Sequence, residues 1–268
     1  MSYENAEPFV NWVGGKRSAL EFIKKYIPTE FKTYYEPFVG GGAMFFDLKP
    51  KTAVLSDLNF DLINAYKVVQ NNVEELITSL EVHEPNNNKS YFHMIKDKIN
   101  NDENINKVER AAMFIYINKT CFKSLYRLTK KNKLSSTYGY RKNALILNKE
   151  NLRACSLQLK KTSICHQNYD SIKPNSGDFV YLDPPYHNCI QEYTIEKFNE
   201  SDQKQLKLFC DDLKNKNVDF ALSNSDTEFI RDLYKDYKII ELDLYNTFYS
   251  KPFSKRPKRK EVLIIKDH

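Results

Sequence analysis

Residues 179–186 constrain the fold most, because an apolar run ends there in Asp183, Pro184, Pro185 and Tyr186. The run Phe-Val-Tyr-Leu is typical of a buried strand. Two consecutive prolines cannot continue a central strand, because they lack an N–H donor and restrict φ. The acid and the ring are therefore expected on a stiff turn at the carboxyl end of a strand. In open α/β sheets, ligands bind at that edge.

A second pattern, near the amino terminus, predicts the unit that lies beside this strand. Residues 33–36 resemble a short strand, followed by the glycines at 40–42 and a helix over 43–48. Residues 53–56 resemble the next strand, which ends at Asp57. Strand, glycine loop, helix, strand and acid follow one another in nucleotide-binding βαβ units, in which the acid accepts hydrogen bonds from ribose hydroxyls. We therefore expect an α/β fold that binds a nucleoside.

The α/β pattern continues on both sides of an irregular region. Residues 119–148 are rich in Lys, Arg, Tyr, Asn, Ser and Thr and show little periodicity, so we expect an irregular insertion there. Further helices are expected over 17–26, 60–70, 73–82, 108–118, 149–159, 202–215 and 227–237, and further strands over 163–165, 219–222, 238–242 and 261–265.

Composition narrows the class of protein. The 268 residues, of which 41% are hydrophobic, predict a packed globular chain, and the formal net charge of +6 is a mild sign of a polyanionic partner. No apolar run reaches the roughly 18 residues of a membrane span. The five cysteines are odd in number and contain no C-x-x-C pair, which argues against a disulfide framework or zinc site and fits a reducing cytosol.

The nucleoside predicted for the glycine loop is one without phosphates. The segment lacks the G-K-[ST] of a phosphate-binding loop, and Glu36 would repel a pyrophosphate. S-adenosylmethionine suits such an acidic pocket, because it combines adenosine, a sulfonium and an amino-acid tail. Lys16, after two glycines, is either a solvated lysine at a helix start or a partner for the tail carboxylate. Trp12, the only tryptophan, is either a core residue or part of the same site.

The turn at Asp183 has a structural and a chemical interpretation. A D-P-P turn can simply end a strand, but here it accompanies a nucleoside-type βαβ unit. Asp183 and the Pro184 carbonyl are suited to accept hydrogen bonds from an exocyclic amino group and to orient its lone pair toward a methyl donor. Tyr186 would stack on the base, which must leave the duplex to be reached.

Four motifs in this order resemble the Dam-type DNA adenine-N6 methyltransferases of the D12 class, α group. They are F-V-N-W-V-G-G-K at 9–16, Y-E-P-F-V-G-G-G at 35–42, S-D-L-N at 56–59 and D-P-P-Y at 183–186. In that family the methyl-donor motifs come first, the target-recognition region next and the D-P-P-Y turn after it. The resemblance spans nearly the whole chain.

The resemblance implies a Rossmann-like, S-adenosylmethionine-dependent catalytic domain with a mostly helical or irregular recognition insertion. Residues 1–59 and 160–268 would form the catalytic domain and residues 60–159 the insertion. The implied catalytic residues are Asp183, Pro184 and Tyr186. The implied donor-binding residues are Trp12, Lys16, Glu36, Phe38, Gly40, Asp57, Tyr169 and Asp183.

The segment 118–127 occupies the place of the family's DNA-reading segment, but its pattern differs. Relatives have a pattern near F-N-G-L-Y-R followed by N-V-P-[FY]-G, whereas this chain has F-K-S-L-Y-R at 122–127 and S-S-T-Y-G at 135–139. Many relatives methylate GATC, which is the first target expected here. The residues expected to contact DNA are Lys119, Lys123, Tyr126, Arg127, Tyr138 and Arg141.

The remaining expectations concern two basic runs and the binding partners of the protein. The basic runs at 130–133 and 251–260 are either solvated loops or contacts to phosphates. Double-stranded DNA is the expected partner, together with a restriction endonuclease for the same site, and the expected state is a cytoplasmic monomer in a bacterial or phage-infected cell. No metal is expected, because methyl transfer from a sulfonium needs none. Methylation of cytosine N4 or an RNA base, and a catalytically silent DNA-binding protein, are the alternatives.

Overall fold

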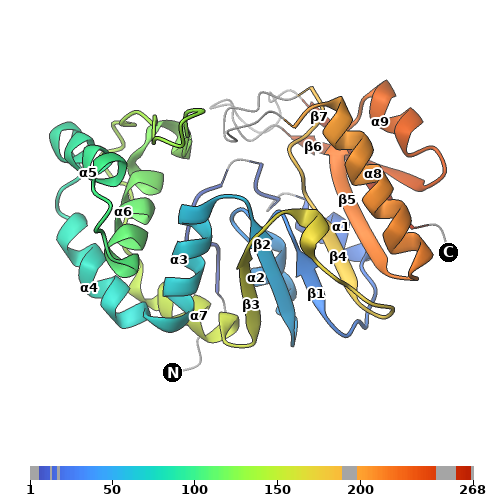
Figure 1. The fold of residues 1–268 in the computed structure, drawn as a ribbon, viewed down its shortest axis with the longest axis horizontal. Coiled ribbons are helices and arrows are strands. Elements are labelled where there is room, and N and C mark those ends of the chain that lie inside the picture. Colours follow the sequence, from blue (N-terminus) through green and yellow to red (C-terminus); the bar gives the residue numbers. More distant parts are fainter. Residues whose placement is uncertain (1–5, 13, 17–18, 189–197, 246–257, 267–268) are drawn as a thin grey trace.

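A computed structural model describes residues 6–12, 14–16, 19–188, 198–245 and 258–266, and a seven-stranded sheet is its centre (Figure 1). The strand order is β3-β2-β1-β4-β5-β7-β6, and β7 is the antiparallel strand of an otherwise parallel sheet. The strands are β1 (Tyr34–Glu36), β2 (Ala53–Asp57), β3 (Thr162–His166), β4 (Phe179–Leu182), β5 (Asp219–Ser225), β6 (Lys238–Tyr245) and β7 (Lys258–Ile265). The predicted α/β, Rossmann-like fold is confirmed.

The sheet reverses its direction of winding between β1 and β4. From β1 the chain proceeds outward to β2 and then β3, whereas β4 and β5 extend to the other side. Tyr34 and Tyr35 pair with Phe179 and Val180 across this junction. Connections that leave in opposite directions open a crevice at the carboxyl ends of the two strands, which is where α/β proteins bind ligands.

Helices cover both faces of the sheet, and β4 is therefore buried on both. Phe179 and Tyr181 face one core cluster, whereas Val180 and Leu182 face the other. The second cluster contains side chains of α8 (Glu200–Asn215) and α9 (Glu228–Leu233), and the first contains those of α2 (Ala43–Leu48), α3 (Phe60–Asn71) and α7 (Lys149–Leu159). Side-chain oxygens begin four of these helices by accepting backbone N–H bonds, those of Asn59, Asn148, Asn199 and Thr227.

Three helices, α4 (Val73–His83), α5 (Lys89–Asn101) and α6 (Lys107–Thr120), form a group at one end of the molecule, drawn in cyan and green in Figure 1. The residues that follow α6 fold back on themselves through antiparallel bridges between Cys121 and Tyr138 and between Leu128 and Leu134. α3 packs against β2 and β3 and also against α4 and α6. The boundary predicted at residue 60 therefore falls at a helix shared by the sheet and the insertion.

Several elements differ from those expected. α5 was not predicted, β6 is longer than expected, and α9 ends at Leu233 rather than at 237. The helix expected over 17–26 appears as α1 (Leu20–Ile23) followed by a 3₁₀ turn over Lys24–Tyr26, with residues 17 and 18 outside the described part. No helix in the described ranges combines the length and apolar character that a membrane crossing requires.

Candidate active site

Asp183 lies at the crevice between β1 and β4, where it forms an ion pair with Lys16. The Lys16 Nζ is 2.7 Å from the Asp183 Oδ1, and it also donates a 2.7 Å hydrogen bond to the Gly14 carbonyl. The same ammonium lies 4.7 Å from the centre of the Tyr186 ring. The structure thus brings together three residues that the sequence predicted, with Lys16 6% and Tyr186 5% exposed. A cation is held beside the carboxylate and the ring assigned to the base.

Glu36 ends β1 on the other side of the crevice and is also buried. Its Oε2 accepts a 2.8 Å hydrogen bond from the Tyr34 hydroxyl. Burial, reinforced by the nearby Asp183 carboxylate, raises the pKa of Glu36 from 4.5 to about 8. The Glu36 carboxyl therefore carries a proton at neutral pH in this state. Two acids thus lie near each other at this edge of the sheet, Asp183 paired with Lys16 and Glu36 with a raised pKa.

Asp57 stands at the end of β2 and is tied to the glycine loop. Its Oδ2 accepts a 3.1 Å hydrogen bond from the Gly40 N–H, and its Oδ1 accepts one of 2.9 Å from the Asn59 N–H. Burial nevertheless raises the pKa of Asp57 above its ordinary value. Gly40 has φ +46°, and a Cβ there would lie 2.6 Å from the Trp12 ring. Trp12 therefore packs directly on the glycine loop.

Phe38 and Tyr169 form an aromatic wall near the same edge. Their rings stack with centroids 5.3 Å apart, and Phe198 meets Phe38 edge-on at 6.2 Å. Asn168 orients the segment by accepting a hydrogen bond from the Tyr169 N–H. Two residues expected to bind the donor, Phe38 and Tyr169, are thus in contact although they lie far apart in the sequence.

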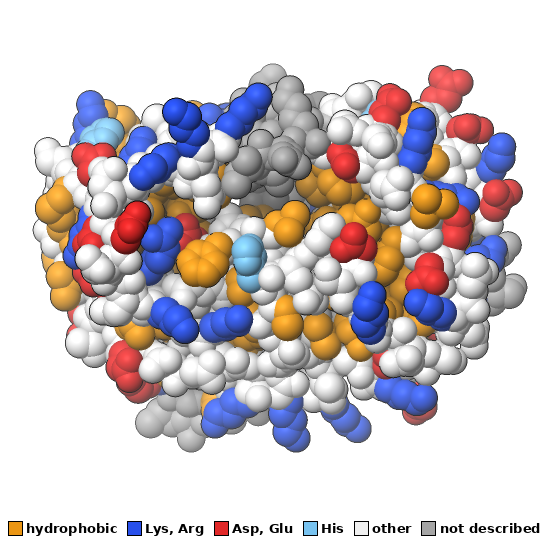
Figure 2. All heavy atoms as spheres, viewed as in Figure 1, with side chains coloured by type: hydrophobic (Ala, Val, Ile, Leu, Met, Phe, Trp, Pro, Cys, Tyr) orange, Lys and Arg blue, Asp and Glu red, His pale blue; other side chains and the backbone are white. Residues whose placement is uncertain are grey.

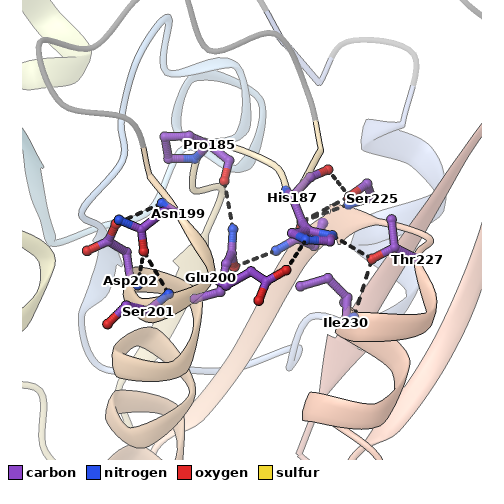
Figure 3. Close-up of polar contacts among 11 residues, drawn as sticks. Pro185, His187, Asn199, Glu200, Ser201, Asp202, Ser225, Thr227 and Ile230 are labelled. Atoms are coloured by element: carbon purple, nitrogen blue, oxygen red, sulfur yellow. Dashed lines mark hydrogen bonds and ion pairs between the residues drawn. The ribbon is translucent and has the colours of Figure 1, made fainter.

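Buried polar side chains form hydrogen bonds to the turn at 183–187, of which Figure 3 labels Pro185 and His187. Gln203 of α8 donates to the Pro185 carbonyl, and Asn224 of β5 accepts from the His187 N–H. The Tyr186 hydroxyl donates a 2.8 Å bond to Glu261 of β7. Sequence reasoning assigned no role to these three supporting residues. For Asn224, the available signal was the polar Ser-Asn pair at 223–224, which follows an apolar run.

The recognition segment exposes basic and aromatic side chains together. Phe122 and Tyr140 are 50% and 67% exposed. Exposed cationic residues of the segment are Lys123, Lys130, Lys131, Lys133, Arg141 and Lys142, whereas Lys119 and Arg127 are half-buried. In Figure 2, Lys and Arg side chains gather at the upper left, above the insertion of Figure 1, and acidic side chains gather toward α8 and α9. Such a surface suits a polyanion.

The turn at Lys123 keeps a left-handed backbone without the family's Asn-Gly. Lys123 has φ +52° and Ser124 has φ +57°, a conformation that Asn and Gly adopt at least cost. The Ser124 hydroxyl accepts hydrogen bonds from Asn11 and from Arg141, each 3.2 Å long. In this chain the turn is thus linked through Ser124 to both Asn11 and Arg141.

Tyr126 is the predicted DNA contact that does not fit its position. It is 2% exposed, its ring packs edge-on against Phe114, and its hydroxyl donates a 2.7 Å bond to Asp61. Asp61 is also paired with Arg110 at 2.5 Å. Contact with DNA would require this side chain to leave the core, so Tyr126 supports the segment from within. Tyr138 is half-buried and donates to the Asn87 carbonyl at 2.9 Å.

Two hydrogen bonds join the backbone of Asn11, next to Trp12, to the side chain of Asn118 in the insertion. The Asn11 N–H donates to the Asn118 side chain at 2.9 Å, and the Asn118 amide donates to the Asn11 carbonyl at 2.8 Å. Asn118, on α6, is fully buried. The residue beside Trp12 is thus fixed to the helix that carries the recognition segment. Residues 251–257 of the second basic run lie outside the described residues.

Comparison with known proteins identifies the family of this chain. Residues 12–248 match the D12 class N6 adenine-specific DNA methyltransferases. The type II methyltransferase M1.LlaDCHI of Lactococcus lactis subsp. cremoris is 36% identical over 97% of this chain and 95% of its own length. The type II methyltransferase M.MjaIII of Methanocaldococcus jannaschii is 35% identical over 87% of this chain and 89% of its own. A DNA adenine methylase of Haemophilus influenzae is 27% identical over 96% and 93%. The chain therefore belongs to the D12 class of N6 adenine-specific DNA methyltransferases.

Proposed function

We propose that this protein transfers a methyl group from S-adenosylmethionine to N6 of an adenine that has been rotated out of a DNA duplex. The observation that carries the proposal is the position of Asp183. It lies at the switch point of the sheet, 2.7 Å from the Lys16 ammonium and next to the Tyr186 ring. A planar base with an exocyclic amine needs this combination of a carboxylate and a stacking surface.

The residues around the glycine loop fit S-adenosylmethionine. Asp57 offers carboxylate oxygens at the end of β2, and the absence of a Cβ at Gly40 leaves room for the Trp12 ring beside the loop. The Asp183 carboxylate suits the cationic part of the molecule, Glu36 lies beside it as a buried acid, and Phe38 with Tyr169 suits the adenine. When bound, the donor supplies an electrophilic methyl group on its sulfonium.

Asp183 and the Pro184 carbonyl are assigned to the target amine. Both accept hydrogen bonds, so together they orient the N6 hydrogens and leave the nitrogen lone pair toward the donor. The Asp183 carboxylate also stabilises the positive charge that develops on N6 as the new bond forms. The Tyr186 ring supplies the stacking surface, and its hydroxyl is held by Glu261 at 2.8 Å.

We assign to Lys16 a change of ion-pair partner, from Asp183 to the donor's carboxylate, when the ligands bind. In this structure its ammonium lies beside both groups that the base would use. A base can enter only after the ammonium has moved. The donor's methionine carboxylate is an alternative anionic partner at the same edge of the sheet, as expected for a lysine that follows two glycines.

The exposed and half-buried surface of residues 119–142 is assigned to the duplex. Lys119, Lys123, Arg127, Tyr138 and Arg141 are proposed to contact DNA, and GATC is the first target to test. We also propose a cytoplasmic monomer. A cognate endonuclease for the same site is proposed because two relatives carry the name of type II methyltransferases.

Transfer of tritiated methyl groups to unmethylated DNA tests the proposal. The wild-type protein is expected to label DNA, and Asp183→Ala is expected to lose the label while remaining folded. Sequencing of methylated adenines in DNA from cells with and without the protein then identifies the target. A wild-type protein that binds the donor but transfers nothing would contradict the enzymatic assignment. If GATC sites were unmodified while another motif was methylated, that motif would replace GATC as the target.

A further inference from the structure

We propose that Gln203 and Asn224 form a buried amide pair that positions the catalytic turn. The inference rests on the proposed function, because it concerns the same turn. Both side chains are fully buried, and they come from different elements, α8 and β5. Neither is expected to touch the base or the donor. They are positioning residues, which act through the backbone of residues 185–187 (Figure 3).

The pair makes one continuous chain of hydrogen bonds. The Gln203 Nε2 donates to the Pro185 carbonyl at 3.0 Å, and its Oε1 accepts from the Asn224 Nδ2 at 3.0 Å. The Asn224 Oδ1 in turn accepts from the His187 N–H at 3.1 Å. The two backbone groups that flank Tyr186 are thus held by one amide pair. Rotation of either amide by 180° would bring like atoms together, so a single orientation is stable.

Further contacts hold the start of α8, which carries Gln203, and hold His187, which donates to Asn224. Asn199 and Asp202 form a capping box that fixes the first turn of α8, from which Gln203 extends. Ser225, which follows Asn224, donates through its hydroxyl to the His187 carbonyl at 2.7 Å. The His187 ring lies 2.9 Å from the Thr227 hydroxyl and stacks on Phe229 at 4.7 Å.

The turn is therefore fixed at three points around Tyr186. The amide pair holds the backbone on either side of the ring, and Glu261 holds the hydroxyl at its far end. Pro184 and Pro185 restrict the remaining torsions. Methyl transfer depends on the alignment of the amine with the donor, and a displacement of about 1 Å can lower the rate by about 100-fold. Loss of one amide contact should therefore affect turnover more than binding.

Two substitutions of Gln203 separate positioning from packing. Gln203→Met keeps the length of the side chain and removes its polar atoms. Gln203→Glu keeps the shape, but a charged carboxylate would face the Pro185 carbonyl. When protonated, that carboxyl can donate to Pro185 and accept from Asn224, as the amide does. Burial favours the protonated form as the pH falls. Gln70→Met is the matched control, because Gln70 donates to the Leu159 and Thr162 carbonyls at 2.7 and 2.8 Å.

The experiment measures kcat and KM for S-adenosylmethionine on DNA of the target sequence. Gln203→Met is expected to lower kcat by about 10- to 100-fold with an unchanged donor KM. The kcat of Gln203→Glu relative to wild type is expected to rise as the pH falls from about 8 to about 6, whereas the ratio for Gln203→Met stays flat. Gln70→Met is expected to lose thermal stability and keep its kcat.

Wild-type kcat in Gln203→Met would overturn the inference. So would equal, pH-independent losses in both Gln203 variants, since these would indicate packing alone. A wild-type protein that transfers no methyl group to DNA would instead overturn the proposed function, so the two failures are distinguishable.

Discussion

The Lys16 ammonium and the Asp183 carboxylate form an ion pair at 2.7 Å, at the point where the sheet reverses its winding. The lysine is 6% exposed, and its charge also lies over the Tyr186 ring. The structure thus places a cation next to a carboxylate and a ring that are proposed to bind an amine and its base. Each group that enters this pocket must therefore compete with Lys16 or offer it another partner.

The ion pair should be visible as coupling between two substitutions. Lys16→Met and Asp183→Asn each remove one charge and leave the other partner, buried Lys16 or half-buried Asp183, less satisfied. The double variant should be more stable than the sum of the single losses predicts, with a coupling of about 1–3 kcal/mol in the free energy of unfolding. Urea denaturation of the four proteins measures it. Additivity within about 0.5 kcal/mol would contradict a direct pair.

Glu36 should make stability depend on pH. Its pKa in the folded protein is about 8, against 4.5 for the exposed group, so between these pH values the folded state holds a proton that the unfolded state has lost. The stability contributed by that proton is present at low pH and is lost as the pH rises through 8. Glu36→Gln should lose less stability than wild type over this range, and the exposed Glu103→Gln should behave as wild type. Parallel wild-type and Glu36→Gln curves in urea titrations would refute the shift.

Gly40 should be essential for donor binding. An alanine there would require a left-handed backbone at φ +46° and would place its Cβ 2.6 Å from the Trp12 ring. We expect Gly40→Ala to weaken the binding of S-adenosylmethionine, measured by calorimetry, by about tenfold or more, a loss of about 1.4 kcal/mol. Gly177→Ala is the control, since it has φ +90° on an exposed loop. It should lower stability and leave donor affinity unchanged, and equal effects on donor affinity would contradict the account.

The exposed pair Lys130 and Lys131 should contribute phosphate contacts. Replacing both by alanine should weaken DNA binding for all sequences and reduce the dependence of log K on log[salt] by about 2, since each phosphate contact contributes about 0.9. Fluorescence anisotropy across a salt series measures this slope. Lys160 and Lys161 form the control, because they precede β3 at the sheet edge opposite the site. A greater effect from the control pair would place the DNA elsewhere.

The elements that could be predicted are those with strong periodicity and clear ends. The apolar run before Asp183 and the glycines before α2 indicated the strand ends at which the site lies. α5 was missed although Phe92, Ile95 and Ile99 recur at helical spacing, because the Asn-rich segments on both sides of it were interpreted as solvated loops. The three side chains are buried in the core, and α5 packs against α6.

Single motifs of the sequence were enough to place Asp183 and Asp57 at strand ends, as the structure has them, and their functional roles stay predictions. Gln203, Asn224 and Glu261 could not be placed in this way, because they come from three elements that meet only in the folded sheet. Tyr126 was assigned to DNA from its place in a motif, but its partner Asp61 is 65 positions earlier in the chain. Burial of that kind depends on tertiary contacts.

The chemical identity of the product tests the central claim most directly. Duplex DNA lacking prior methylation is incubated with wild-type protein and S-adenosylmethionine, digested to nucleosides and analysed by mass spectrometry. The account predicts N6-methyladenine from the wild type and a loss of at least about 100-fold from Asp183→Asn, which keeps the shape of the side chain but removes its charge. N4-methylcytosine as the product, or full activity in Asp183→Asn, would contradict it.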